Sequence, residues 1–375
     1  MIIQNGQVAL PGKNHPQALD IRVQDGRIAE LGPHLAGEST ILDARGLLVL
    51  PGGIDPHVHF DTPGYTEREE FYPASCAAAS GGITTVIDMP CTSIPPVTNA
   101  ANLRFKQAAI EHRSVIDYGL YGGVSAQSFA EGGARWMREL AGDVLGFKAY
   151  FVSGMPSFER LDHDTFGQVL AVAAELDLPV LLHAEDYDTV QAATPAAMAA
   201  GHAPRHYYQS RPEAAEIRAV RAAVDLAREI GADLHVVHVG TAAAARIVGQ
   251  SRATCETAPH YLAFTLEDFE RIGAPLKITP PVKPAPNREQ LWELLADGTI
   301  AFVASDHAPC PAREKNTGSI WTDYGGIPGT GTMLPYLFSE GYLKQRLSLS
   351  RLLRCSLEIG ELLLKPQAEL HPAPG

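Results

Sequence analysis

The chain has 375 residues, of which 45% are hydrophobic and 19% charged, an ordinary globular composition that excludes a disordered protein. A formal net charge of −13 excludes a nucleic-acid partner, because a phosphate backbone requires a basic face. The five cysteines show no C-x-x-C spacing, so neither a disulfide framework nor a thiolate zinc site is predicted. With no signal-peptide pattern and no apolar run long enough to span a bilayer, we expect a cytoplasmic protein.

Residues 1–50 read as short strands separated by turns, with Asp25-Gly26 as a hairpin signal. From Pro51 onward, short apolar runs alternate with helix-length segments, which is typical of a parallel sheet built from βα units. Eight such runs predict a closed (β/α)₈ barrel: 52–60, 82–90, 115–123, 144–151, 179–185, 234–240, 252–259 and 299–307.

Two of the intervening segments have contrasting patterns. The segment 213–230 is predicted to be an outer helix whose inner face carries five apolar residues: Ile217, Val220, Val224, Ala227 and Ile230. The segment 185–211 has no strong periodicity and is predicted to be a long loop after the fifth strand. It is either a lid over the barrel mouth or a plain insertion.

The run ending in "PGGIDPHVHF" places two histidines, His57 and His59, on the same side of a strand. Two converging imidazoles suit a transition-metal site, although a strand that happens to carry two histidines is an equally simple explanation. The choice depends on whether the other strands supply further ligands.

Four other polar residues stand on or at the end of predicted barrel strands: Lys148, His183, His238 and Asp306. Taken singly, each histidine fits a hydrogen-bonded core or rim residue, the aspartate a loop cap, and the lysine a side chain that snorkels or pairs with a carboxylate. Because the carboxyl ends of barrel strands converge on one mouth, all six residues together predict a metal centre.

Lys148 is the unusual member, because a protonated amine has no lone pair for a cation. A neutral amine that has reacted with CO₂ would offer two anionic carbamate oxygens, which could bridge two metals. We therefore predict that Lys148 is carboxylated.

The chain resembles the cyclic amidohydrolases of the amidohydrolase superfamily, namely the dihydroorotases, allantoinases and hydantoinases/dihydropyrimidinases. The resemblance covers nearly the whole length, because nine motifs stand in family order: "PGGIDPHVHF", "GGITTVIDMP", "GFKAYF", "LLHAED", "SRPEAAEIRAV", "HVVHVGT", "ETAPHYL", "KITPPVK" and "VASDHAPC". It implies a (β/α)₈ barrel beside a small β-sandwich, homo-oligomers (dimers or tetramers), and two divalent metals, commonly zinc.

By this resemblance, one metal is bound by His57, His59 and Asp306, the other by His183 and His238, and carboxylated Lys148 bridges them. Two such cations hold a water and lower its pKa, so that hydroxide attacks the scissile carbonyl. Asp306 then accepts the proton and delivers it to the departing nitrogen. The predicted reaction is hydrolytic opening of a cyclic amide, imide or ureide.

Several residues next to the predicted metal ligands distinguish between the possible cyclic substrates. Dihydroorotases carry Leu-Arg, Asn and His where this chain has Phe60-Asp61, Cys91 and Cys310. Those departures remove donors for a substrate carboxylate, and Asp61 adds a negative charge. The segments "PGYTEREEF" and "SDHAPCP", and Thr279 in "KITPP", are closer to allantoinases, whereas "MPCT" matches neither form.

We therefore predict an allantoinase-like enzyme acting on an uncharged ureide or hydantoin-type ring. A dihydroorotase or dihydroorotase-like enzyme, a hydantoinase or dihydropyrimidinase, and a noncatalytic scaffold that has lost its metals stay open as alternatives. Predicted substrate contacts are Asp61, Cys91, His260, Thr279 and Cys310.

Three parts of the chain are predicted: residues 1–50 in the small β-sandwich, 51–345 in the barrel, and 346–375 as a helical segment that starts back toward the small domain. Because "LLKPQAELHPAPG" resembles the family segment just before that return, we expect the small domain to lack C-terminal strands and to have exposed strand edges.

Overall fold

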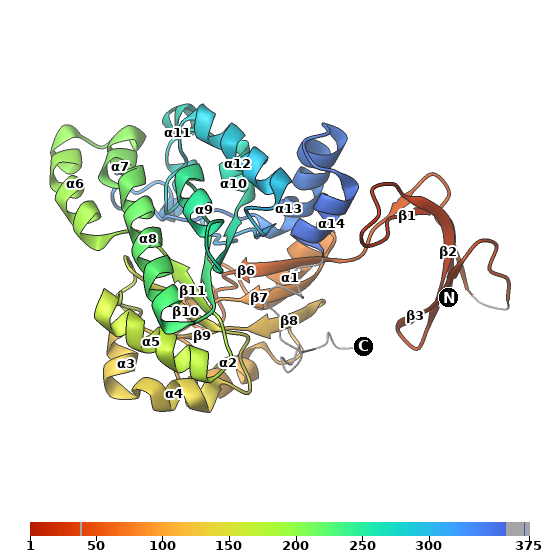
Figure 1. Ribbon diagram of the computed structural model, residues 1–375, viewed down its shortest axis with the longest axis horizontal. Helices are drawn as coiled ribbons and strands as arrows, with labels where there is room; N and C mark the ends of the chain where they lie inside the picture. Colours follow the sequence, from red (N-terminus) through yellow and green to blue (C-terminus); the bar gives the residue numbers. More distant parts are fainter. Residues whose placement is uncertain (38–39, 358–370, 372–375) are drawn as a thin grey trace.

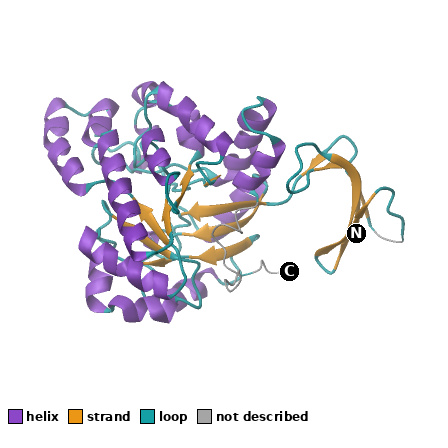
Figure 2. Cartoon of the chain, in the orientation of Figure 1, coloured by secondary structure: helices purple, strands orange, loops and turns teal. Residues whose placement is uncertain are grey.

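The computed structural model describes residues 1–37, 40–357 and 371. A body of strands surrounded by helices forms most of the molecule, and the first fifty residues form a separate small sheet beside it (Figure 1). Figure 2 shows the helices on the outside of this body and its strands inside, as the alternating pattern predicts.

The small sheet has the strand order β3-β2-β1-β4, with β5 also pairing with β1. The predicted hairpin at Asp25-Gly26 is confirmed, because both residues have positive φ and join two antiparallel strands. The strands of this sheet are β1 (Ile2–Val8), β2 (Gln17–Gln24), β3 (Arg27–Gly32), β4 (Ile41–Asp43) and β5 (Leu48–Val49).

Each of the eight predicted apolar runs contains barrel strand, and the run 115–123 contains two short pieces. All neighbouring pairs are parallel and follow chain order, in one sheet of β6-β7-β8 and one from β9 to β14. The strands are β6 (Gly53–Val58), β7 (Ile83–Asp88), β8 (Asp117–Leu120), β9 (Gly122–Gly123), β10 (Phe147–Tyr150), β11 (Val180–His183), β12 (Leu234–Val236), β13 (Thr254–Thr257) and β14 (Phe302–Val303).

The first and last of these strands meet. Val58 at the end of β6 forms a parallel bridge with His307, which follows β14, and the His59 amide donates to the His307 carbonyl at 2.8 Å. The two sheets also join between β8 and β9, which are separated by Tyr121 alone and so continue one another along the chain. The strands are therefore arranged as in a (β/α)₈ barrel, with their carboxyl ends at one mouth.

The predicted outer helix is confirmed as α8, whose Val220, Val224 and Ala227 are buried and whose Ile217 and Ile230 pack against the core. The α-helices of the described residues are α1 (Phe71–Ser80), α2 (Ala100–Ile110), α3 (Ala126–Glu131), α4 (Gly133–Leu140), α5 (His163–Glu175), α6 (Tyr187–Ala200), α7 (Pro204–Ser210), α8 (Glu213–Ile230), α9 (Ala242–Val248), α10 (Pro259–Ala263), α11 (Leu266–Ile272), α12 (Ala285–Asp297), α13 (Thr330–Tyr336) and α14 (Leu349–Ser356).

The prediction of a long loop over 185–211 is wrong, because this segment forms the helices α6 and α7. Asp186 caps α6 by accepting from the Thr189 amide, and α7 begins with Pro204. The segment is rich in alanine, which has the highest helix propensity but produces only a weak apolar stripe. Its role as a lid or a plain insertion stays a prediction.

The predicted division into 1–50, 51–345 and 346–375 also stays a prediction. Its first boundary falls between β5 and β6, and α14 lies in the third part. The predicted return toward the small domain lies outside the described residues. Within the described ranges, no helix combines the length and hydropathy needed to cross a membrane.

Candidate metal centre and active site

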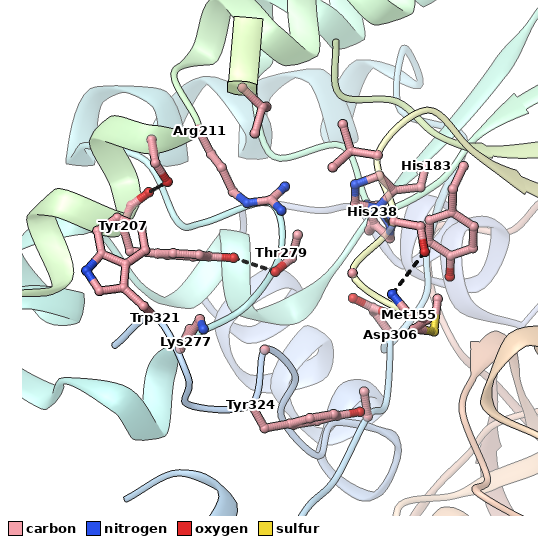
Figure 3. A pocket seen from close by; sticks show the side chains of 18 of the residues that line it. Met155, His183, Tyr207, Arg211, His238, Lys277, Thr279, Asp306, Trp321 and Tyr324 are labelled. Carbon is pink, nitrogen blue, oxygen red and sulfur yellow. Dashed lines mark hydrogen bonds between the residues drawn. The ribbon is translucent and has the colours of Figure 1, made fainter. Parts of the chain in front are cut away.

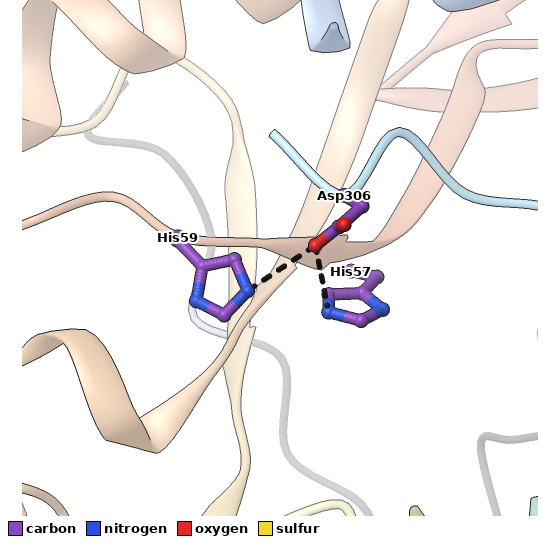
Figure 4. A group of neighbouring side chains, drawn as sticks. All are labelled: His57, His59 and Asp306. Carbon is purple, nitrogen blue, oxygen red and sulfur yellow. Dashed lines mark ion pairs between the residues drawn. The ribbon is translucent and has the colours of Figure 1, made fainter. Parts of the chain in front are cut away.

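Three of the six predicted ligands meet where the first and last barrel strands adjoin. Asp306 Oδ1 lies 3.3 Å from His57 Nε2 and 3.3 Å from His59 Nε2 (Figure 4). The ligand atoms of the three residues all lie within 4.8 Å of one another. His57 Nε2 is buried without a hydrogen-bond partner, which is energetically unfavourable unless a ligand such as a cation binds this nitrogen.

Two further histidines form a second group beside the first. His183 ends β11, and its Nδ1 lies 3.1 Å from His238 Nε2. The rings of His57 and His238 are 5.5 Å apart between centroids, so the two groups are adjacent. Burial lowers the pKa of all three of these histidines, which favours neutral imidazoles with a free lone pair. Neutral nitrogen donors with one carboxylate suit a zinc-like cation.

Lys148, on β10, is fully buried, and its Nζ has no hydrogen-bond partner. Its Nζ lies 4.8 Å from the centre of the Tyr150 ring, and that ring stacks on His183 with 5.2 Å between centroids, so Lys148 lies beside the second group. Burial lowers the pKa of Lys148 to about 8. A neutral amine, which the reaction with CO₂ requires, is therefore accessible near physiological pH.

The backbone holds two of these residues in unusual conformations. Asp306 has a φ of 48° and His238 a φ of 39°, which non-glycine residues adopt rarely and mostly at functional sites. The next residue, His307, anchors Asp306: its Nδ1 accepts from the Gly329 amide at 3.0 Å and its Nε2 lies 2.7 Å from Glu69 Oε2. Its backbone carbonyl is the acceptor for the amide of His59. The neighbouring histidine thus fixes the backbone from which Asp306 reaches the site.

Sequence reasoning missed a buried carboxylate behind His57. Glu256 Oε1 lies 2.5 Å from His57 Nδ1 and accepts from the His238 amide at 3.2 Å. Its Oε2 lies 3.2 Å from His235 Nε2, and that ring is held in turn by Thr254 at 2.8 Å. A carboxylate on Nδ1 leaves the Nε2 lone pair of His57 directed toward Asp306. Glu256 stands in the quoted motif "ETAPHYL", but nothing in that pattern marks its partner.

Replacing this carboxylate should weaken metal binding. In Glu256→Gln, the amide presents an NH₂ group to one of its two histidine partners, so the orientation of His57 loosens. Mutations of such supporting groups cost about 10–100-fold in metal affinity or activity, and we expect a loss of that size. Equilibrium dialysis of zinc against the wild-type and variant proteins measures it.

The matched control is Glu289→Gln, because the Glu289 side chain is 45% exposed and pairs with surface arginines. It should bind zinc as the wild type does. An unchanged zinc affinity in Glu256→Gln would show that the buried carboxylate does not orient His57.

A second supporting carboxylate lies behind His183. Glu185 Oε2 is 2.8 Å from His183 Nε2 and also accepts from the Arg211 guanidinium. Although burial opposes ionisation, Arg211 and His183 lower the pKa of Glu185 to about 2. Sequence reasoning missed both Glu185 and Arg211, although the first stands in "LLHAED" and the second in "SRPEAAEIRAV".

A cavity of about 510 Å³ opens over the metal ligands (Figure 3). His59, His183, His238 and Asp306 form one part of its lining, and Tyr150, Tyr207, Trp321 and Tyr324 supply aromatic surface. Its polar groups include Arg211, Lys277 and Thr279. This size and mixture suit a small planar molecule with several hydrogen-bonding groups.

Of the five predicted substrate contacts, Thr279 lines this cavity, and its Oγ1 lies 2.5 Å from the Tyr207 hydroxyl. The other four, Asp61, Cys91, His260 and Cys310, are not part of its lining. Cys91 lies behind the wall, with its Sγ 3.1 Å from the Tyr150 hydroxyl and 3.7 Å from His59 Nδ1. Contact of these residues with a substrate stays a prediction.

The placement of Asp61 corrects one step of the sequence argument. Its side chain is fully buried, and neither oxygen has a hydrogen-bond partner. Burial raises the pKa of Asp61 to about 8, so the carboxyl is mainly protonated at neutral pH. It therefore does not present a negative charge to a ligand in the cavity, and the expected repulsion of a substrate carboxylate loses its physical basis.

Comparison with known proteins agrees with this geometry. The amidohydrolase family model matches residues 48–355. The chain is 42% identical to an allantoinase of Rubrobacter xylanophilus over 351 residues, which cover 91% of this chain and 76% of that relative. It is 39% identical to an allantoinase of Solibacter usitatus over 360 residues, which cover 94% of this chain and 77% of that relative.

Among solved structures, the L-hydantoinase (dihydropyrimidinase) of Arthrobacter aurescens has a TM-score of 0.91 and 30% identity, covering 96% of this chain and 82% of that one. A D-hydantoinase has a TM-score of 0.87 and 28% identity, covering 96% of this chain and 81% of that one. The fold, the site and the relatives lead to one assignment: the chain is an enzyme of the amidohydrolase family and belongs to its cyclic amidohydrolases.

Proposed function

We propose that the protein is a metal-dependent hydrolase that opens the ring of allantoin. The observation that carries this proposal is the 42% identity to an allantoinase over 91% of the chain, a length that includes the whole metal centre and cavity wall. The cavity supports it, because hydroxyl and cationic donors and aromatic surface fit the carbonyl oxygens and flat ring of a ureide.

The proposed metal assignment follows the two groups of ligands. His57, His59 and Asp306 would hold one divalent cation, His183 and His238 would hold the other, and carboxylated Lys148 would bridge them. When bound, the two cations, which we propose are Zn²⁺, would supply an acidified water and polarise the scissile carbonyl. Two atoms support this assignment, His57 Nε2 and Lys148 Nζ, because both are buried polar atoms without a hydrogen-bond partner.

In this proposal, Asp306 is the catalytic residue that moves the proton. It lines the cavity, and although burial opposes its ionisation, His57 and His59 lower its pKa well below the usual range. As a carboxylate, Asp306 would accept a proton from the attacking water and return it to the ring nitrogen as the C–N bond breaks. The hydroxyl groups of Thr279 and Tyr207 would orient the allantoin ring by hydrogen bonding.

One observation favours a second candidate, dihydroorotate. Lys277 lines the cavity and is a cation that could pair with a substrate carboxylate, although burial lowers its pKa to about 8. Arg211 also lines the cavity, but its guanidinium donates to Glu185, so Lys277 is the better candidate to pair with a substrate carboxylate. The hydantoinase neighbours keep hydantoin and dihydrouracil in the same test.

A hydrolysis panel separates these substrates. We expect kcat/KM to be highest for allantoin among allantoin, dihydroorotate, hydantoin and dihydrouracil, measured with the zinc-loaded protein. A preference for dihydroorotate would contradict the allantoinase proposal and assign the carboxylate to Lys277. In that case Lys277→Met should abolish the preference, and Lys344→Met, an exposed lysine on the outer surface, should leave it unchanged.

Two further expectations accompany the proposal. A homo-oligomer, dimer or tetramer, is expected by resemblance and is testable by light scattering of the purified protein. A cytoplasmic location is supported by the five free cysteines, which form no disulfide.

A further inference from the structure

The two halves of the metal centre are supported in different ways. Behind His57, Glu256 on β13 is held by His235 on β12 and by the His238 amide, and Thr254 on β13 holds the His235 ring in turn. Behind His183, Glu185 is held by Arg211, which follows helix α7. One half is therefore anchored in the barrel and the other through the cavity wall.

Glu185 has few other partners. It is 1% exposed, and within the described part of the chain Arg211 is the cation in ion-pair contact with it. Lys283, the next cation, instead lies 3.9 Å from Glu216. A buried carboxylate without a paired cation is costly, and its orientation follows the group that neutralises it.

The geometry transmits this orientation to the metal ligand. Since Glu185 Oε2 receives the Nε2–H of His183, the lone pair of that ring stands on Nδ1, the atom that lies 3.1 Å from His238 Nε2. The same Glu185 oxygen accepts from Arg211, so moving the guanidinium moves the acceptor that aligns the imidazole. Figure 3 shows Arg211 reaching from the cavity wall toward the two histidines.

From this chain of contacts we infer that Arg211 is a positioning residue: through Glu185 it sets the affinity of the His183–His238 half of the centre for its metal. The inference rests on the proposed metal centre and adds to it a dependence of one half on the α7 segment. The half formed by His57, His59 and Asp306 does not share this dependence.

The test compares Arg211→Met with the matched control Arg205→Met. Arg205 stands on α7, the helix that Arg211 follows, and also pairs with a glutamate, Glu270, but at the outer surface. We expect Arg211→Met to bind one zinc, at the half formed by His57, His59 and Asp306, as the wild type does. It should bind the second zinc, at the His183–His238 half, about 10–100-fold more weakly. Arg205→Met should bind both as the wild type does. Equilibrium dialysis and competition with a chelator give the two affinities.

Kinetics separate a positioning role from a direct one. In Arg211→Met, the zinc concentration that gives half-maximal turnover should rise about 10–100-fold, in step with the weaker zinc affinity of the His183–His238 half. Glu185→Gln should reproduce this pattern, and Arg211→Lys should lie between the variant and the wild type because it keeps the charge without the guanidinium fork. Circular dichroism confirms that each variant is folded, and Glu185→Gln replaces Arg211→Met as the deciding variant if the latter does not fold.

The inference is overturned by an unchanged zinc affinity of the His183–His238 half in Arg211→Met and Glu185→Gln, or by equal weakening of both zinc sites. A wild type that binds fewer than two zinc ions also overturns it. A wrong substrate proposal would give a different result, because the wild type would then bind two zinc ions but would not open allantoin. The zinc affinities of the variants would still test the role of Arg211.

Discussion

Asp306→Asn should nearly abolish turnover while leaving the protein folded. The substitution keeps the shape of the side chain and one oxygen near His57 and His59, but the amide cannot accept and return a proton at neutral pH. Loss of a positioned acid–base group costs about 10²–10⁴-fold, and we expect the upper end because the same side chain is a proposed metal ligand. Steady-state ring opening, measured at saturating zinc, gives the value.

The control for this variant is Asp225→Asn, because Asp225 is an exposed residue of α8 paired with Arg228. It should keep wild-type turnover. If Asp306→Asn retained wild-type turnover with both metals bound, the proton-transfer role of Asp306 would have to be abandoned.

Lys148→Ala should lose both the bridge between the metals and the activity. Removal of the proposed carbamate takes away two anionic oxygens from a fully buried position. Metal-ion catalysis contributes several kcal/mol of transition-state stabilisation, so we expect a loss of at least about 10³-fold. Zinc content measured by elemental analysis should fall below two per chain.

The vacated space gives this experiment a positive arm. Acetate or propionate can enter where the lysine side chain stood and supply a carboxylate, so both acids should restore part of the zinc content and turnover in Lys148→Ala. Neither should affect the wild type. A variant that kept both metals at full occupancy without added acid would show that Lys148 does not bridge them.

Much of the barrel could be predicted because its signal is local. Short apolar runs, the hairpin at Asp25-Gly26 and the inner face of α8 depend on the spacing of neighbouring residues, and all three are confirmed. The six proposed metal ligands could also be predicted from the sequence, because parallel barrel strands bring their carboxyl ends together regardless of the conformation of the loops.

The missed features depend on relations that spacing does not carry. The helices α6 and α7 are rich in alanine and lack a strong apolar stripe, so their periodicity was too weak to predict them. Glu256 and Glu185 contact His57 and His183 through an arrangement fixed by the fold, and Arg211 in turn contacts Glu185.

Asp61 illustrates the opposite failure. The comparison with dihydroorotases rested on its position in the sequence, and the charge assigned to it assumed exposure to the ligand. Burial makes the neutral acid the stable form at neutral pH, and burial cannot be read from residue type. The cavity wall and the relatives, and not Asp61, support the proposed substrate.

The most direct test of the account is a zinc titration of the metal-free protein in bicarbonate buffer, with allantoin ring opening followed at each point. The account predicts that activity rises with bound zinc and reaches its plateau at two ions per chain. Ring opening at the full rate by the metal-free protein, or a protein that binds two zinc ions and opens none of the four rings, would contradict it.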